Sequence, residues 1–548
     1  MKNIFSLPQQ FLAKYKSPRF TIIGNLIYQS CFSQLKSNGE REVWTETVER
    51  LVNRVFRQYV EFNKSKTDYT ELATDMYDKM FNMKFLPYSN SWVCDKNFSS
   101  CAFVSTELVG DEHNVSKPFV FCFDKLLHGH NITFDTKLVR ENLIIQAPLK
   151  DKSIKYRTED PIELVKLLLD SYFFAYPHID FDYTAMKTNT NIEELHKNLM
   201  NILNRNVGKK LDTALLIDII SSMNKESKLN IICELSDITK NLINTSVYTP
   251  LGIDYSEIEG LVKDGVELLW LENMRKYERM DGQQKFKDYR VEGTSTGLTL
   301  ESYEQAPLIE IFLNNHSSLE EFKDTLQLAL LYAKIGLMGN FWEESEEVVK
   351  RNSRVGCSLS GIAQFLTRHS LHTLKEWCGI GYTTLQSYNS HLSSTLGIPR
   401  SIKLTCISSD QLTSLLAGAT TGLNYPEYRT YIQEVKVNSD DLIHYSESKG
   451  CVVENGIVKV PVKWKMKTKK DQSIWEQLNL MAFLQKYWAD NQINCTIHYK
   501  DTDNVIEALN YFQYQLKSLH LLPDHRIPED SIKEITDEEY SNMIKKMD

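Results

Sequence analysis

Long amphipathic helices alternating with strand-like runs are the feature that most limits the folds open to this chain. Residues 40–62 place a row of apolar side chains on one helical face, namely Trp44, Val48, Leu51, Val52, Val55, Phe56 and Tyr59. Two further helices are predicted over residues 319–339, with a glycine at the C-cap, and 503–517, with Asp503 as a candidate N-cap. Runs rich in β-branched and aromatic residues predict strands over 430–437, 457–464 and 495–499. This mixture predicts an α/β barrel or wound sheet behind a helical N-terminal region.

Composition excludes several classes of protein. The 548 residues are 42% hydrophobic and 25% charged, which is typical of a soluble globular protein. A net charge of −9 without a strongly basic stretch argues against a nucleic-acid partner. We expect no membrane span, because no apolar run is long enough. The N-terminus lacks a secretory h-region, which predicts a cytoplasmic protein, although the absence of acidic residues from positions 1–20 leaves an organellar presequence open.

The ten cysteines are scattered and form no CxxC pair. In a chain of this size they predict reduced, mostly buried thiols. His369, His372 and Cys378 have spacings that could serve zinc, but no fourth ligand is visible, so no metal site is predicted.

Several collinear motifs resemble one known family. Residues 100–106 (SCAFVST), 351–362 (RNSRVGCSLSGI) and 414–420 (SLLAGAT) are similar to its segments. So are residues 11–15 (FLAKY) and 41–48 (REVWTETV) near the N-terminus. The C-terminal third adds IWEQL, LQKYWADN, CTI and LLP between residues 474 and 523.

These motifs resemble the monomeric, adenosylcobalamin-dependent (class II) ribonucleoside-triphosphate reductases. The resemblance implies a ten-stranded α/β barrel with a finger loop through its centre, near residues 293–310. We therefore expect a mainly helical region over residues 1–110, the barrel over 111–530 and a short acidic tail over 531–548.

The family chemistry implied by the resemblance is radical reduction of the ribose 2′-carbon, and the cofactor supplies the radical. A finger-loop cysteine becomes a thiyl radical and takes the 3′ hydrogen. A glutamate two residues further on acts as general base. Two more cysteines deliver electrons and close into a disulfide.

The finger loop of this chain lacks these groups. Residues 293–306 read GTSTGLTLESYEQA, where the family has GTNPCxEQTLESYELC. The TLESYE core is intact, but Ser295, Thr296 and Gly297 occupy the tip, which is two residues shorter. A hydroxyl cannot replace the thiol, because an O–H bond is much stronger than an S–H bond. Ala306 replaces the second cysteine, and its redox partner survives alone as Cys101.

The segments that would face substrate are also altered. The family's phosphate-binding PSGT turn, which presents N–H groups at a helix N-terminus, matches Ser409, Asp410, Gln411 and Leu412. The glycine is lost, and Asp410 would repel phosphate. The glycine-rich GGGVGFD loop becomes residues 129–135 (GHNITFD), and residues 186–191 replace another glycine-rich loop. Side chains at these positions should partly fill the substrate space and weaken nucleotide binding.

We expect a catalytically inactive homologue that serves as a structural or protein-binding subunit with an unidentified protein partner and no cofactor. One alternative is a nucleotide or cobalamin sensor. The other is an active reductase that uses adenosylcobalamin and a displaced radical site, for which Cys357 and Cys406 are the candidates.

Overall fold

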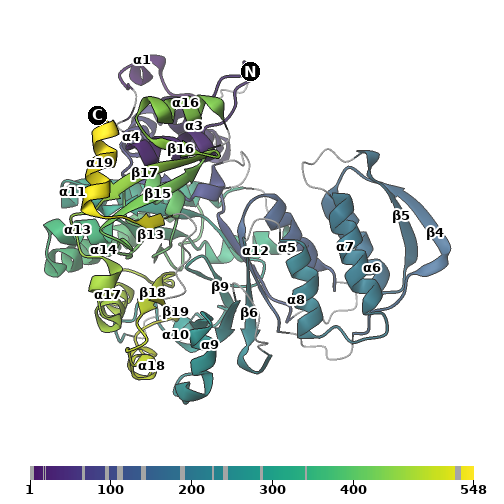
Figure 1. The fold of residues 1–548 in the computed structure, drawn as a ribbon. Coiled ribbons are helices and arrows are strands. Elements are labelled where there is room, and N and C mark those ends of the chain that lie inside the picture. Colours follow the sequence, from purple (N-terminus) through teal and green to yellow (C-terminus); the bar gives the residue numbers. More distant parts are fainter. Residues whose placement is uncertain are drawn as a thin grey trace.

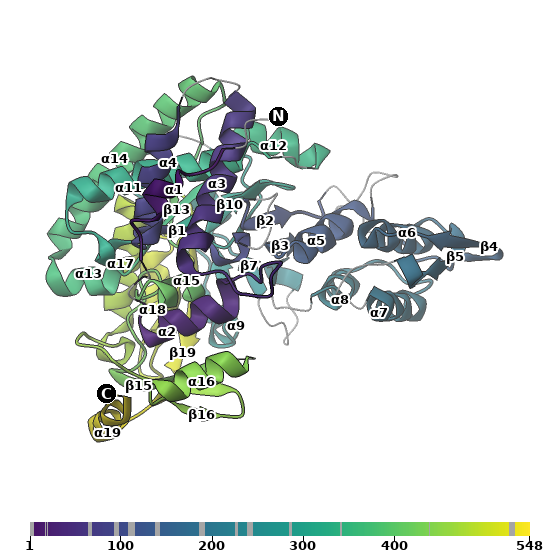
Figure 2. The same ribbon diagram turned by 90° about the horizontal axis from the view of Figure 1, so that it is seen from above.

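The computed structural model describes residues 5–547, except 17, 19, 64–67, 93–97, 108–114, 138–142, 186–191, 225–227, 238–244, 284–287, 340–341, 438 and 525–531. Its strands and helices form an α/β fold from which one lobe projects in both views (Figures 1 and 2). The expected substrate-loop segment 186–191 and the limits expected at 110/111 and 530/531 fall at residues outside this description. The domain limits therefore stay predictions.

The N-terminal region is helical, as predicted. Its helices are α1 (Gln9–Leu12), α2 (Ile22–Ile27), α3 (Trp44–Asn63) and α4 (Thr70–Phe81). All seven apolar residues predicted to share a face of α3 are buried. The helix packs on α4 and on α11 (Leu319–Gly336), so its apolar face joins the main core. Helical periodicity alone identified this contact surface.

Ten strands make up two groups of parallel strands. The first group is β2 (Cys101–Val104), β3 (Asn131–Asp135), β6 (Leu229–Glu234), β7 (Thr245–Tyr248) and β8 (Glu267–Leu269). The second contains β12 (Leu308–Phe312), β13 (Gly356–Ser360) and β14 (Thr405–Cys406), together with the parallel pair β18 (Thr496–Tyr499) and β19 (Ser518–Pro523). β1 (Phe85–Pro87) pairs antiparallel with β12.

Three side-by-side pairings join these strands to one another. β8 runs antiparallel to β19, with Leu269 opposite Ser518. A parallel bridge joins Ile407, just after β14, to Ile493, just before β18. On the other side, β11 (Gln305–Ala306) lies directly before β12 and pairs antiparallel with β2. These contacts connect the ten strands, and the predicted α/β class is confirmed.

Helices cover the outside of the strands. α11 packs on β12 and β13, and α5 (Lys117–Leu127) packs on β2 and β3. α17 (Ile474–Tyr487) covers β18, α9 (Glu259–Lys263) covers β19, and α14 (Leu371–Leu396) packs on α11. All three predicted helices differ from the structure at their ends. α3 begins at Trp44 rather than 40, and α11 ends at Gly336 rather than 339, with Leu337 instead of a glycine as its C-cap. α18 (Val505–Phe512) ends at Phe512 rather than 517 and is capped by Asn504 rather than Asp503.

The projecting lobe and a separate small sheet complete the fold. The lobe contains α6 (Pro161–Phe173), α7 (Ile192–Arg205), α8 (Thr213–Ser222) and the parallel pair β4 (Leu149–Arg157) and β5 (Pro177–Asp182) (Figure 1). The small sheet has the order β16 (Val452–Glu454), β17 (Ile457–Lys463), β15 (Thr430–Lys436) and β20 (Ile532–Glu534). α19 (Asp537–Met547) packs on β17 and β15, so the C-terminal segment is folded onto this sheet.

Among the described helices, none is both long and apolar enough to cross a lipid bilayer.

Candidate functional site

The segment expected to form the finger loop is a short β hairpin. β9 (Gly293–Ser295) pairs antiparallel with β10 (Leu298–Leu300). The two turn residues, Thr296 and Gly297, both have positive φ, at 51° and 87°. This is the backbone of a type I′ turn, which glycine adopts freely and a β-branched residue such as threonine adopts only rarely. The tip therefore consists of the residues predicted from the sequence.

The hairpin lies between the two groups of strands and contacts both. On the first group, the Ser295 hydroxyl donates to the Asn131 carbonyl oxygen at 3.4 Å, and β9 packs on β2 and β3. On the second, the Gln492 N–H donates to the Gly297 carbonyl oxygen at 3.1 Å. A Cβ on Gly297 would lie 3.0 Å from the Ile407 carbonyl oxygen. The tip thus lies between the two groups of strands.

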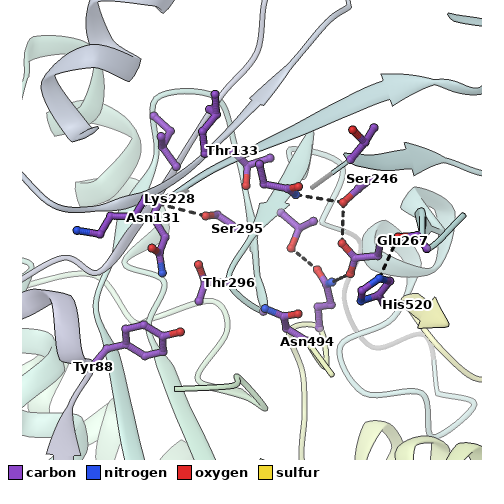
Figure 3. Close-up of a pocket in the computed structure, with 18 residues that line it drawn as sticks. Tyr88, Asn131, Thr133, Lys228, Ser246, Glu267, Ser295, Thr296, Asn494 and His520 are labelled. Carbon is purple, nitrogen blue, oxygen red and sulfur yellow. Dashed lines mark hydrogen bonds between the residues drawn. The ribbon is translucent and has the colours of Figure 1, made fainter. Parts of the chain in front are cut away.

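A polar cavity of about 360 Å³ opens at this tip (Figure 3). Its walls come from the hairpin and from the starts of β3, β6, β7 and β8, joined by residues near β18 and β19. The lining residues are Tyr88, Asn131, Ile132, Thr133, Lys228, Leu229, Asn230, Thr245, Ser246, Gly265, Glu267, Thr294, Ser295, Thr296, Gly297, Gln492, Asn494 and His520. Amides and hydroxyls dominate this surface, which suits a polar ligand better than an apolar one.

Glu267 is the carboxylate of the cavity. Ser246 Oγ donates to its Oε2 at 2.7 Å, and Gln492 Nε2 donates to its Oε1 at 2.8 Å. Burial raises the pKa of Glu267, and these hydrogen bonds oppose the rise. Nearby, His520 Nε2 bonds the Gly265 carbonyl oxygen at 2.9 Å. In Figure 3, Glu267 and His520 lie on one side of Thr296 and Tyr88 lies on the other.

No cysteine is among the described residues that line this cavity. Cys101 on β2 faces Ala306 on β11, and its thiol donates to the Ala306 carbonyl oxygen at 3.6 Å. Cys406 belongs to the same apolar cluster as Cys101. Cys357 faces Ile309 in the β12–β13 pair and belongs to the main core. Burial raises the pKa of all three thiols, so they stay protonated at neutral pH.

The expected phosphate turn is occupied by a carboxylate from the chain itself. Asp410 caps α15 (Gln411–Leu416), accepts from the Ser89 N–H at 2.7 Å and from the Thr413 N–H at 3.3 Å, and is buried. Burial raises its pKa. Ser409 instead donates its hydroxyl to the Asn494 carbonyl oxygen at 2.9 Å. Asp410 therefore already accepts the N–H groups that would otherwise be available to an anion.

The altered glycine loop contributes directly to the cavity wall. Asn131 and Thr133 on β3 point into the cavity, while His130 is buried beside the Lys125 carbonyl oxygen, 3.2 Å from its Nδ1. Burial lowers the pKa of His130 to about 3, which keeps the ring neutral. The cavity stays open between these side chains, and the predicted partial filling of the substrate space stays a prediction.

Sequence reasoning missed Glu267, Gln492 and His520. None belongs to a recognisable motif, and each comes from a different segment: Glu267 from β8, Gln492 from the loop before β18, and His520 from β19. Nowhere do the described residues include a group of three or more His, Cys, Asp or Glu side chains placed to hold a metal ion.

Comparisons with known proteins agree with these observations. The family described as "Ribonucleotide reductase alpha domain" matches residues 7–95. The chain is 34% identical to the "Probable adenosylcobalamin-dependent ribonucleoside-triphosphate reductase" of Dictyostelium discoideum, over 95% of this chain and 81% of the relative. It is 33% identical to the adenosylcobalamin-dependent ribonucleoside-triphosphate reductase of Euglena gracilis, over 97% of this chain and 84% of the relative.

Two solved structures have the same fold. A B-12 dependent (class II) ribonucleotide reductase superposes with a TM-score of 0.88 at 20% identity, over 99% of this chain and 97% of the other. The alpha subunit of the class Id ribonucleotide reductase of Actinobacillus ureae superposes with a TM-score of 0.57 at 12% identity, over 93% and 98% of the two chains.

Proposed function

The chain belongs to the adenosylcobalamin-dependent ribonucleoside-triphosphate reductase family, and from that premise we propose that it is a non-catalytic member that acts as a structural or protein-binding subunit. The observation that carries the proposal is the hairpin tip. It presents Ser295, Thr296 and Gly297 to the cavity, and none of these residues has a sulfur atom. We infer that this hairpin is the counterpart of the family's finger loop.

The residues around the cavity do not fit the adenosylcobalamin chemistry that the resemblance implies. That chemistry needs a thiol at the tip to carry the radical, and the described lining contains none. The O–H groups of Ser295 and Thr296 are poor substitutes because their bonds are stronger. Glu267 could act as a base, but a base alone cannot begin hydrogen abstraction from a ribose carbon.

The electron-delivering pair is also incomplete. Cys101 keeps its position on β2, but the residue directly opposite is Ala306, so no disulfide can close between these two positions. Cys357 and Cys406, the candidates for a displaced radical site, are fully buried in apolar clusters and do not line the cavity. Their placement weighs against the alternative of an active reductase.

The experiment that tests the proposal is a turnover assay. Purified protein is incubated with adenosylcobalamin, a dithiol reductant and each ribonucleoside triphosphate, and deoxynucleotide is measured by mass spectrometry. We expect none above a blank without protein, while the Euglena gracilis relative serves as the positive control. Deoxynucleotide formation that disappears in Cys357→Ser or Cys406→Ser would overturn the proposal and favour a displaced radical site.

The open cavity favours one second candidate, a sensor that binds a nucleotide or cobalamin without reacting. Its amides, hydroxyls and Glu267 could hold a polar ligand. Because Asp410 already accepts the Ser89 and Thr413 N–H groups, we expect weak nucleotide binding and no change in melting temperature at millimolar nucleotide. An upward shift with one nucleotide or with cobalamin, lost in Glu267→Gln, would favour the sensor.

A further inference from the structure

An open groove of about 910 Å³ lies between α13 (Ile362–Arg368) and α17, away from the hairpin cavity, with which it shares no lining residue. One wall is a single face of α17. Glu476, Leu480, Phe483 and Tyr487 lie four, three and four residues apart, and side chains at these spacings share a helix face. This face is about 16 Å long at 1.5 Å per residue, which is about three helical turns. The groove therefore has the length of a short helix.

The opposite wall and one end of the groove are also helical. Ala363, Leu366 and Thr367 of α13 face the groove at positions i, i+3 and i+4. Leu371, the first residue of α14, lies beside them with 48% of its surface exposed. A groove lined by apolar side chains from two helices is of the kind in which an amphipathic helix binds.

The apolar side chains of these two walls, together called the apolar floor of the groove, are only partly covered. Leu366, Leu480, Phe483 and Tyr487 are half-buried and pack against the main core from the outside. The rings of Phe483 and Tyr487 lie 4.8 Å apart. Together with Leu371 they give one groove several partly exposed apolar side chains beside polar groups, and exposed apolar surface with a polar rim is a common feature of protein-binding sites.

Lysines border this floor. Lys465, Lys467 and Lys486 line the groove, and Glu476 is the one acidic residue among the described lining residues, 3.6 Å from Lys467. Lys465 and Lys486 form no ion pair with any described residue. The groove thus carries a local positive excess on a chain whose net charge is −9. Charge complementarity selects an acidic occupant.

We propose that this groove binds an acidic, amphipathic helix of a partner protein, with apolar side chains at i, i+3 or i+4, and i+7 entering the floor and carboxylates facing Lys465, Lys467 and Lys486. The inference rests on the proposed role as a protein-binding subunit and names the surface and the chemistry of the partner. An apolar floor of this length favours a protein helix over a nucleic acid, whose affinity would come mainly from phosphate contacts.

The test measures binding of a fluorescent helical peptide to the full-length protein by anisotropy. The probe is a four-turn peptide with leucine and phenylalanine on one face and glutamate elsewhere. We expect saturable binding that weakens as salt rises, because the rim contacts are electrostatic. A peptide with lysine in place of glutamate, one with serine in place of the apolar residues, and a single-stranded oligonucleotide should each bind at least about tenfold more weakly.

Variants locate the site. The double variant Lys465→Glu/Lys486→Glu and the variant Leu371→Ser should each weaken peptide binding by about tenfold or more. Lys155→Glu is the matched control, because Lys155 is exposed on β4 in the projecting lobe. Circular dichroism should show that all variants fold. Binding that is absent, equal for the basic peptide or the oligonucleotide, or unchanged in both groove variants would overturn the inference.

Sedimentation of the protein alone completes the test. Self-association that is lost in Lys465→Glu/Lys486→Glu would assign the groove to a second copy of this chain and overturn the inference, and a monomer at all concentrations supports it. The turnover assay is independent of this result. Deoxynucleotide formation would refute the non-catalytic role, while peptide binding would still decide whether the groove is a docking site.

Discussion

Cys101 and Ala306 lie directly opposite each other where β2 and β11 pair, and the Cys101 thiol donates a hydrogen bond to the backbone carbonyl oxygen of Ala306. The backbone geometry of a facing pair is therefore kept while one of the two side chains needed for a disulfide is missing. Direct antiparallel partners have Cα atoms about 4.5 or 5.5 Å apart, within the range of about 4.4–6.8 Å that disulfides need.

The first prediction restores the pair. Ala306→Cys should form a disulfide with Cys101 under mild oxidation, because the register already places the two positions face to face. Peptide mapping should find Cys101 linked to the cysteine introduced at position 306. The number of titratable thiols should fall by two relative to the reduced form of the same variant. Ala306→Ser is the control and should keep all its thiols. A variant that stays fully reduced while folded would show that the side chains do not point toward each other.

The second prediction concerns the carboxylate at the expected phosphate turn. Asp410→Ala should lower the free energy of unfolding by about 1–3 kcal/mol, because α15 loses its N-cap and the part-buried Ser89 N–H loses its acceptor. Asp410→Asn keeps an acceptor oxygen and should cost less. Urea unfolding compares the two. Equal losses for alanine and asparagine would mean that the two hydrogen bonds contribute little to stability.

The third prediction concerns the buried ion cluster of Arg354. Its guanidinium donates to Glu304 Oε2 at 3.0 Å and, through Nη2, to Asp288 Oδ1 at 3.1 Å, and the side chain is fully buried. Arg354→Met leaves two carboxylates without this partner and should cost about 3–5 kcal/mol in urea unfolding.

Arg351 provides the matched control. It pairs with Glu301 but has 32% of its side chain exposed. Arg351→Met should therefore cost about 1 kcal/mol or less, since water screens exposed pairs. Similar losses in both variants would contradict the argument that burial sets the cost.

The fourth prediction concerns pH. Burial lowers the pKa of His316 to about 4, and the neutral ring bonds the Phe312 carbonyl oxygen and the Thr325 hydroxyl. The unfolded state takes up a proton below its ordinary pKa of about 6.5, and the folded state does so only near 4. Stability should therefore fall as pH decreases from about 6.5 to about 4, with His316 contributing at most about 3 kcal/mol.

Urea unfolding across this range checks the pH prediction. His316→Gln should flatten the decline relative to the unsubstituted protein, because the glutamine does not titrate. His444, which has 79% of its side chain exposed, supplies the control, and His444→Gln should keep the original slope. A decline of equal steepness in His316→Gln would place the pH sensitivity elsewhere.

Local sequence patterns were enough to predict several elements of the fold and the composition of the hairpin tip. The helical period of residues 40–62 identified α3 and its buried face, because side chains three and four residues apart share a helix surface wherever the helix lies. The β-branched runs identified β15, β17 and β18. The composition of the hairpin tip, without sulfur and with Thr296–Gly297 at the turn, could be read directly from the chain.

Helix ends were harder to predict than helix cores. α11 stops at Gly336, and Asn504 rather than Asp503 caps α18. The side chain of Asn504 reaches the Glu507 N–H, whereas Asp503 is turned to the Lys500 N–H instead. Which of two neighbouring polar residues caps a helix depends on how the preceding turn folds, and periodicity carries no information on that turn.

The sequence by itself determined the family, the amphipathic helices and the absence of a thiol from the hairpin tip, because each is written in residue identity or in local spacing. Only the tertiary structure decided what now surrounds that tip. Glu267 meets Gln492, and Ser89 meets Asp410, across 225 and 321 residues of chain. These contacts depend on how strands from the two groups are joined, and the order in which distant strands become neighbours is set by the packing of the whole barrel rather than by any local pattern.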